Sequence, residues 1–304
     1  MSELPLPPAT RQLGSSGIAV SPIAWGMWRL AENGRSAADA AKLVHAALDA
    51  GITLLDTADI YGFDGNGGFG DAEALLGEVM AADPALRSRM VLASKGGIMP
   101  PLPYDQSRGY LSSAIDASLR RMRVDMIDLH QIHRPDILTH PQELARTLED
   151  AVAAGKIRTI GVSNFTQPQI EALAHLMDLP IVSTQPEISP LRIDCFENGE
   201  LDQAMRLGMT PFAWSPLGGG RLLSPGNARD AAVAAELDRI GQAQGVGRSV
   251  AAFGWLMAHP AGIVPIIGSQ SPERIAEAMQ ALEMRWTRQD WYAVLVAARG
   301  EPLP

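Results

Sequence analysis

The 304-residue chain repeats one pattern eight times: an apolar run of strand length, then a longer stretch with helical periodicity. No linker or change of composition interrupts this alternation, so it predicts one α/β domain over residues 1–304. Eight parallel strands can close a (β/α)8 TIM barrel, which we favour over an open doubly wound sheet. The predicted strands span 22–25, 53–57, 90–94, 126–132, 159–163, 181–185, 210–214 and 263–267. The predicted helices span 36–51, 71–82, 113–124, 141–156, 167–177, 197–208, 230–245, 249–259 and 271–282.

Glycines mark the ends of several predicted helices. Gly51, Gly155, Gly208 and Gly245 stand where a left-handed residue closes the last turn of a helix. The composition, 46% hydrophobic and 19% charged, is that of a globular chain able to bury a large core.

Charge and hydropathy exclude several kinds of partner. The net charge of −9 is dispersed with no basic block, so nucleic acid and anionic membranes are poor partners. The uncharged stretch 249–272 is long enough to imitate a membrane span. Pro260 and Pro265 interrupt it, however, and we expect a helix followed by a short buried strand.

The single cysteine, Cys195, cannot form an internal disulfide, which favours a reducing compartment. The first ten residues lack the basic and then apolar pattern of a secretory signal. We therefore expect a soluble cytoplasmic protein. We also expect a monomer or weak homo-oligomer, and no metal site.

Polar side chains gather where the predicted strands end. In a barrel, catalytic groups come from the carboxyl ends of the strands and the loops that follow. Asp56 ends the second strand, Tyr61 lies on its loop, and Lys95 ends the third. His133 follows the fourth strand, and alternation places His130 on the opposite, outward face of that strand.

These four groups suit proton transfer to a substrate. A tyrosine titrates near ~10, and an adjacent ammonium should lower its pKa while a carboxylate holds that ammonium in place. Taken alone, Asp56 could cap a helix and Lys95 could be a solvated strand end. The convergence of Asp56, Tyr61, Lys95 and His133 on one end of a barrel favours a catalytic site.

The chain resembles the aldo-keto reductase family from about Leu13 to its last helix. An ordered set of segments carries the resemblance: "LLDTADIYG", "SKGG", "MIDLHQIHRPD", "GKIRTIGVSNFT", "TQPEISP", "FAWSPLGGGRL" and "VPIIGSQSPERIAEAM". The resemblance implies a barrel with an N-terminal β-hairpin and an extra C-terminal helix. It also implies reduction of aldehydes or ketones by NADPH, which such a barrel holds without a Rossmann domain.

The resemblance further implies a role for each matching residue. Tyr61 would donate the proton, Lys95 paired with Asp56 would lower its pKa, and His133 would orient the substrate carbonyl beside Trp28. The implied cofactor-binding residues, from the nicotinamide end to the adenine end, are Met27, Trp28, Asp56, Ser163, Asn164, Gln185, Trp214, Ser215, Pro216, Leu217, Gly218, Gly219, Arg221, Gly268, Ser269, Gln270, Arg274, Glu277 and Ala278. Within this set, Ser269, Gln270 and Arg274 would meet the adenosine 2′-phosphate.

Four positions depart from the family pattern. His130 and Trp214 each replace a usual tyrosine, and an indole offers an equally usable stacking face. Gly268 replaces a phosphate-binding lysine, and Ala278 replaces an asparagine. Arg274 remains as a phosphate ligand, so we expect NADP(H), with NAD(H) as the alternative.

Three loops should wall the substrate pocket: "GMWRL", "GGIMPPLPYDQSRGY" and the tail after Trp286. The second is apolar enough to receive a bulky or aromatic carbonyl, although a proline-rich loop is equally explained as a rigid connector. Two rival functions share the fold: a lyase in which Lys95 forms a Schiff base, and a nicotinamide-binding regulatory protein with little turnover.

Overall fold

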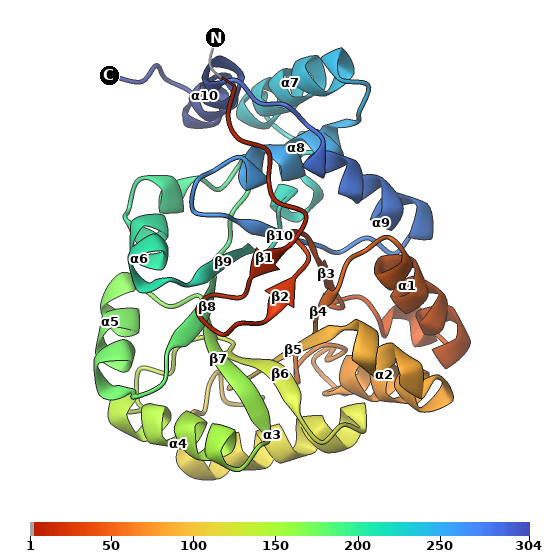
Figure 1. Ribbon diagram of the computed structural model, residues 1–304, viewed down its shortest axis with the longest axis vertical. Coiled ribbons are helices and arrows are strands. Elements are labelled where there is room, and N and C mark those ends of the chain that lie inside the picture. Colours follow the sequence, from red (N-terminus) through yellow and green to blue (C-terminus); the bar gives the residue numbers. More distant parts are fainter. Residues whose placement is uncertain (1–2) are drawn as a thin grey trace.

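The computed structural model describes residues 3–304 and contains a closed barrel of eight parallel strands, which confirms the predicted fold class (Figure 1). Each strand pairs with its neighbours in chain order, and the last pairs with the first to close the ring. The barrel strands are β3 (Ala24–Gly26), β4 (Leu54–Asp56), β5 (Val91–Gly96), β6 (Ile127–Ile132), β7 (Ile157–Ser163), β8 (Ile181–Gln185), β9 (Thr210–Ala213) and β10 (Val264–Ile267).

A hairpin of β1 (Arg11–Gln12) and β2 (Ala19–Val20) precedes the barrel and lies across one end of it (Figure 1). Its apolar side chains belong to the same buried cluster as the inward-facing residues of the strands. That cluster contains Leu13, Ile18, Val20, Ala24, Leu54, Ala93, Leu129, Val182, Phe212, Val264 and Ile266. The hairpin therefore plugs the amino end of the barrel, and polar groups have room only at the carboxyl end.

Helices surround the strands, and a second, larger apolar cluster fills the space between the two layers. The α-helices are α1 (Ala37–Asp49), α2 (Asp71–Ala82), α3 (Arg108–Met122), α4 (Pro141–Ala153), α5 (Gln167–Leu176), α6 (Glu200–Leu207), α7 (Ala228–Ala243), α8 (Arg248–Met257), α9 (Pro272–Ala278) and α10 (Arg288–Arg299). Short 3-10 turns are η1 (Glu32–Gly34), η2 (Pro84–Arg89), η3 (Asp194–Phe196), η4 (Gly218–Gly220) and η5 (Met279–Leu282).

The helix boundaries largely follow the predictions. The four glycines expected at helix ends have φ angles between 64° and 87°, in the left-handed region. The start of α3 was wrong: the helix begins at Arg108 because the Ser107 side chain accepts a hydrogen bond from the Tyr110 amide. The predicted helix over 271–282 consists of α9 and the 3-10 turn η5, and α10 is the extra helix at the end of the chain.

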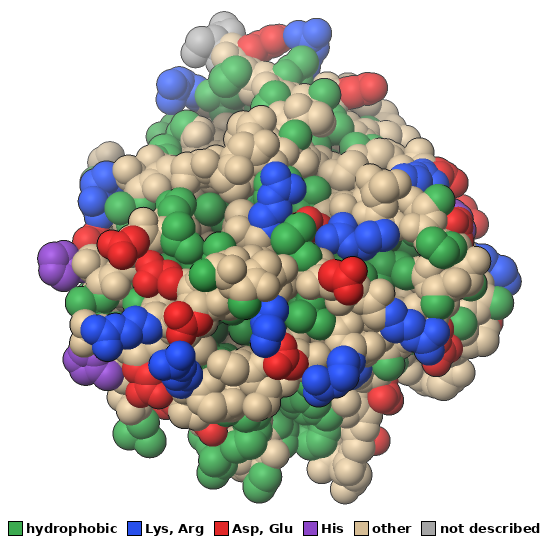
Figure 2. All heavy atoms as spheres, turned by 60° about the horizontal axis from the view of Figure 1, so that its bottom comes forward, with side chains coloured by type: hydrophobic (Ala, Val, Ile, Leu, Met, Phe, Trp, Pro, Cys, Tyr) green, Lys and Arg blue, Asp and Glu red, His purple; other side chains and the backbone are tan. Residues whose placement is uncertain are grey.

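The uncharged stretch 249–272 forms most of α8 and the buried strand β10, as predicted. Within residues 3–304, no helix has both the length and the apolar character needed to cross a bilayer. Figure 2 brings the side of α3 and α4 forward, and basic and acidic side chains alternate across it without a patch of one sign.

Candidate active site

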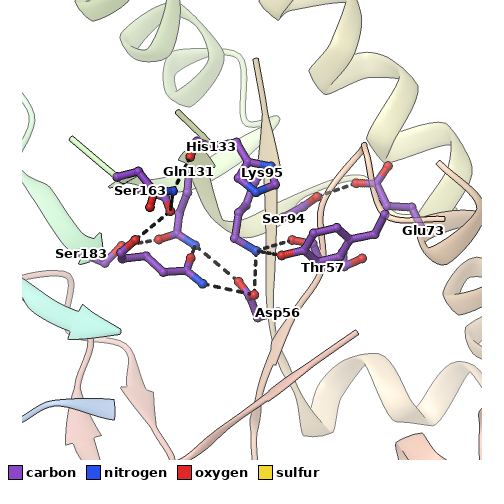
Figure 3. Close-up of polar contacts among 12 residues, drawn as sticks. Asp56, Thr57, Glu73, Ser94, Lys95, Gln131, His133, Ser163 and Ser183 are labelled. Carbon is purple, nitrogen blue, oxygen red and sulfur yellow. Dashed lines mark hydrogen bonds and ion pairs between the residues drawn. The ribbon is translucent and has the colours of Figure 1, made fainter. Parts of the chain in front are cut away.

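A buried lysine lies between a carboxylate and a phenol at the carboxyl end of the barrel. The Lys95 ammonium donates to Asp56 Oδ2 at 2.6 Å, to the Thr57 carbonyl at 2.9 Å and to the Tyr61 oxygen at 3.0 Å. Lys95 is 1% exposed and Asp56 3% exposed. Figure 3 shows the lysine side chain reaching across to Asp56 and Thr57. The structure thus joins three of the four predicted catalytic residues directly.

Backbone hydrogen bonds position the loop that carries Tyr61. After β4 ends, the Thr57 amide donates to the Ala93 carbonyl and the Asp59 amide donates to the Lys95 carbonyl. The chain then turns, with the Tyr61 amide donating to the Ala58 carbonyl. These bonds attach the loop to the neighbouring strand β5, so the phenol returns to the end of Lys95.

Burial and charge act in opposite directions on these groups. Burial opposes the charge of the Lys95 ammonium, but Asp56 and Tyr61 outweigh it and raise its pKa. For Tyr61, burial is the larger effect, and it raises the pKa of the phenol although Lys95 acts to lower it. The predicted net lowering of the Tyr61 pKa is therefore wrong, although the effect of Lys95 has the predicted direction. The phenol keeps its proton at neutral pH, with a cation ready to stabilise the phenolate once the proton leaves.

Two aromatic side chains flank Tyr61 on the mouth of the barrel. The His133 and Trp28 rings lie 5.8 Å and 5.7 Å from the Tyr61 ring, each edge-on at 79°. Burial, followed by the nearby Lys95 and Arg134, holds the pKa of His133 well below its usual value, so the imidazole is neutral. Trp28 is 65% exposed, which leaves its indole available to a ligand.

A network of side-chain amides holds the other side of Asp56, and it includes Gln131 and Ser183, which the sequence analysis did not single out. The Gln131 amide donates to Gln185 Oε1 at 2.7 Å and to Asp56 Oδ1 at 3.4 Å, and Gln185 donates to Asp56 Oδ2 at 3.4 Å. The Ser183 hydroxyl donates to Gln131 at 3.2 Å (Figure 3). Gln131 stands two residues before His133, so strand alternation puts the two on the same face, and this spacing was the signal in the sequence.

The residues expected around a nicotinamide carboxamide come together beside this network. The Ser163 hydroxyl donates to the Gln185 carbonyl at 2.8 Å, and the Asn164 amide donates to Ser163 and to the His133 carbonyl. The Trp214 indole donates to Asn164 Oδ1 at 3.0 Å, which fixes the plane of that ring. Asn164 has φ 58°, a left-handed conformation that asparagine tolerates well.

The loop after β9 is tightly turned where a pyrophosphate was expected. Ser215, Gly218, Gly219 and Gly220 all have φ between 52° and 91°, and a Cβ on Gly219 or Gly220 would meet nothing within 4 Å. The Gly218 and Gly220 amides hydrogen-bond to the Ser215 and Leu217 carbonyls within the turn. The fit to a dinucleotide phosphate therefore rests on the open space beside Gly219 and Gly220, which lets a phosphate approach the backbone closely. Pro216 and Leu217 complete the turn, buried and partly buried respectively.

Arg221, expected at the same pyrophosphate, is engaged elsewhere. Its guanidinium binds the buried Asp230 carboxylate of α7 through two hydrogen bonds of 2.8 and 2.6 Å. A bidentate pair of this kind holds the arginine in one orientation. The pair thus attaches this loop to α7 through Nε and Nη2, while the arginine side chain is still 52% exposed, and its contact with a pyrophosphate stays a prediction.

The expected adenosine residues form the segment from β10 into α9. Gly268, Arg274 and Glu277 are exposed, whereas Ser269 and Gln270 are partly buried. Ala278 is buried and belongs to the large core cluster, as does Met27, which was expected nearer the nicotinamide. The Ser269 carbonyl accepts a hydrogen bond from the Trp25 indole at 3.0 Å, which attaches the segment to the first barrel strand.

A second polar cluster lies outside the barrel, behind Lys95. The Ser94 hydroxyl donates to Glu73 of α2, and Arg121 of α3 donates to the same carboxylate. His130 is the register partner of Ser94, is fully buried, and has its pKa lowered to about 4 by burial and Lys95. Burial raises the pKa of Asp59 well above its usual value, with a smaller contribution from Glu73. The outward orientation predicted for His130 is confirmed, and neither His130 nor Asp59 reaches the site.

Comparison with known proteins agrees with this geometry. Residues 22–295 match the model of the aldo/keto reductase family. A protein of Novosphingobium aromaticivorans called 6-dehydroglucose reductase is 76% identical over the full length of both chains. One of the same description from Agrobacterium fabrum is 39% identical, covering 94% of this chain and 97% of its own. The crystal structure of the thermostable aldo-keto reductase Tm1743 with the inhibitor epalrestat superposes with a TM-score of 0.83 at 24% identity, covering 95% of this chain and 99% of its own.

Proposed function

This chain belongs to the aldo/keto reductase family and is an oxidoreductase of carbonyl compounds, and we propose that NADPH is its reductant and Tyr61 its proton donor. The observation that carries the proposal is the 3.0 Å contact between the Tyr61 oxygen and a lysine that Asp56 keeps charged. A protonated phenol beside a fixed cation can protonate an alkoxide as it forms, because the phenolate left behind is stabilised by that cation.

Each residue of the site would have its own role in the reduction of the carbonyl. Tyr61 would hydrogen-bond the carbonyl oxygen and pass its proton to it, and Lys95 would hold the resulting phenolate. The neutral His133 would donate a second hydrogen bond and fix the angle of the carbonyl. When bound, the reduced nicotinamide supplies the hydride to the carbonyl carbon. Trp28 would shield the mouth from water.

We assign the cofactor-binding residues from the way they are arranged at the carboxyl end of the barrel. We propose that Ser163, Asn164 and Gln185 bind the carboxamide and that Trp214 stacks on the ring, since these four already form one hydrogen-bonded set. The open backbone from Ser215 to Gly220 would take the pyrophosphate. The segment from Gly268 to Glu277 would take the adenosine, with NADPH preferred over NADH.

The substrate we propose is a sugar oxidised to an aldehyde at C6. The relative that is 76% identical along the whole chain is called 6-dehydroglucose reductase, and so is the relative at 39% identity. A hydroxyl-rich aldehyde differs from the bulky or aromatic carbonyl that the apolar loop 96–110 suggested. We expect the product to be the corresponding primary alcohol, in a cytoplasmic enzyme that works as a monomer or weak oligomer.

The test is the fall of NADPH absorbance with 6-dehydroglucose, compared with aromatic aldehydes, ketones and quinones. We expect the sugar aldehyde to have the highest kcat/KM. Absence of NADPH oxidation across the whole panel would favour a regulatory protein. Covalent trapping of a carbonyl substrate on Lys95 by borohydride would instead favour the Schiff-base lyase.

A further inference from the structure

Two arginines from the loop after β3 lie against the segment that follows β10. The Arg29 guanidinium donates from Nη2 to the Gly268 carbonyl at 3.1 Å. Arg35 donates to Gln270 Oε1 at 3.0 Å and, through Nε, to the Leu30 carbonyl at 2.9 Å. These contacts join residues 239 and 235 positions apart in the chain, so they are visible only in the folded barrel.

Positive charge at this place is not neutralised by the protein. Across residues 3–304, neither Arg29 nor Arg35 forms an ion pair, and Arg274 forms none either. Two carboxylates close in sequence to these arginines bond to other groups: Asp39 pairs with Lys42 at 2.8 Å, and Glu273 accepts from the Ser271 hydroxyl at 2.5 Å. In a chain with a net charge of −9, two arginines contact this short segment and a third, Arg274, follows it in α9, and within residues 3–304 none of the three forms an ion pair.

Arg29 has hydrogen-bonding capacity left for a ligand. Its Nη2 contacts one backbone carbonyl, and its Nε and Nη1 have no acceptor within the described chain. Gly268, whose carbonyl it holds, is exposed, and a side chain there would meet nothing within 4 Å. Nη2 uses only one of its two N–H groups on the Gly268 carbonyl, so its other N–H and the adjacent N–H of Nε or Nη1 still form one planar fork. Such a fork on an exposed side chain matches the geometry of a phosphate monoester.

We propose that Arg29, supported by Arg35, reads the 2′-phosphate of NADPH and supplies the charge that a lysine at position 268 would otherwise provide. The inference rests on the proposed use of NADPH and names the residues that set the preference over NADH. Arg35 acts mainly as a positioning residue, because it holds Gln270 and the turn at Leu30. Arg274, on the α9 side of the segment, completes the set.

The experiment measures dissociation constants by titration calorimetry for NADPH, NADH, adenosine 2′,5′-bisphosphate and 5′-AMP, without any substrate. The variants are Arg29→Ala, Arg29→Lys, Arg35→Ala and the double variant Arg29→Ala with Arg35→Ala. Arg120→Ala on α3 removes an equal charge far from the segment and serves as the matched control.

We expect Arg29→Ala to weaken NADPH and the bisphosphate roughly tenfold while leaving NADH and 5′-AMP within about twofold, the scale of one charge-assisted hydrogen bond near solvent. Arg29→Lys should recover part of the loss, and the double variant should bind both dinucleotides almost equally. Equal losses of affinity for NADPH and NADH in Arg29→Ala would overturn the inference, because Arg29 would then contact a part of the dinucleotide that NADPH and NADH have in common. If wild-type protein bound neither dinucleotide, the proposed function would fail and this assignment with it.

Discussion

Replacing Asp56 by asparagine tests the ion pair at the centre of the site. The change keeps the shape of the side chain but removes the charge that lies 2.6 Å from the Lys95 ammonium. Both side chains are at most 4% exposed, so water cannot take the place of the lost carboxylate. Breaking a buried pair from one side costs about 3–5 kcal/mol, and we expect a loss of that size in the free energy of unfolding at pH 7.

The stability of the wild type and that of Asp56→Asn should change differently with pH. In the wild type the pKa of Lys95 is raised, so its stabilising charge is present below ~10.4, the value in the unfolded chain, and is lost only as pH rises through the folded value. In Asp56→Asn, burial dominates and lowers that pKa. The variant should then gain stability as pH rises from neutral towards ~10, because the folded lysine can shed a proton that the unfolded one still binds.

Activity should change in the opposite direction. The uncharged lysine cannot stabilise a Tyr61 phenolate, so kcat of Asp56→Asn should fall as pH rises, by roughly a hundredfold or more where Lys95 is neutral. The assay is thermal unfolding and NADPH-dependent turnover, both measured from pH 5 to 10.

The chain provides a control with the same geometry on the surface. Arg89 and Asp49 also lie 2.6 Å apart, but their side chains are 42% and 66% exposed. Because an exposed ion pair contributes little to stability, Asp49→Asn should leave the free energy of unfolding and the pH profile nearly unchanged between pH 5 and 10. If Asp56→Asn behaved like Asp49→Asn, the reasoning about the buried pair would be refuted.

Three further changes probe other parts of the account. Arg274→Ala should weaken NADPH more than NADH in a binding titration, and equal losses would place the 2′-phosphate elsewhere. Gln131→Leu should lower the melting temperature by leaving Gln185 Oε1 without its donor, a cost of about 1–3 kcal/mol, and should reduce kcat; an unchanged kcat would show that the amide network does not position Asp56. Asp59→Asn should stabilise the fold at pH 7. Because the pKa of Asp59 is raised in the folded protein, ionised Asp59 lowers the free energy of unfolding of the wild type at pH values above the pKa of an ordinary aspartate. That gain should vanish as pH falls towards ~4, and a pH-independent gain would contradict the burial effect.

Much of the site could be predicted because strand ends are local features. The run from Leu54 to Asp56 and the run from Val91 to Lys95 each place their last side chain by simple alternation, and adjacent parallel strands bring the two ends together. The opposed orientations of His130 and His133 follow from the same rule.

What could not be predicted depends on burial and on contacts between distant segments. The pKa of Tyr61 is raised because the folded loop partly buries the phenol, and the identity of its neighbours alone does not reveal this. The sequence also did not reveal that the Arg221 guanidinium pairs with the buried Asp230 carboxylate of α7. Arg29 and Gly268 meet only because the last strand closes against the first.

Family membership supplied what local patterns lacked. No periodicity indicates that Tyr61, on an irregular loop, would return to Lys95; the segment "LLDTADIYG" suggested it by resemblance, and the loop's bonds to β5 explain it. The beginning of α3 was missed because a serine is common in loops, and only the folded structure shows that the Ser107 side chain accepts a hydrogen bond from the Tyr110 amide and so caps the helix.

The most direct test of the central claim is the turnover of Tyr61→Phe beside its affinity for NADPH. The substitution removes one oxygen, 3.0 Å from Lys95, and leaves the aromatic ring between His133 and Trp28. We predict that the dissociation constant for NADPH stays within about twofold while kcat falls by roughly two orders of magnitude or more. A variant that binds NADPH and reduces the sugar aldehyde at the wild-type rate would contradict the assignment of Tyr61 as the proton donor.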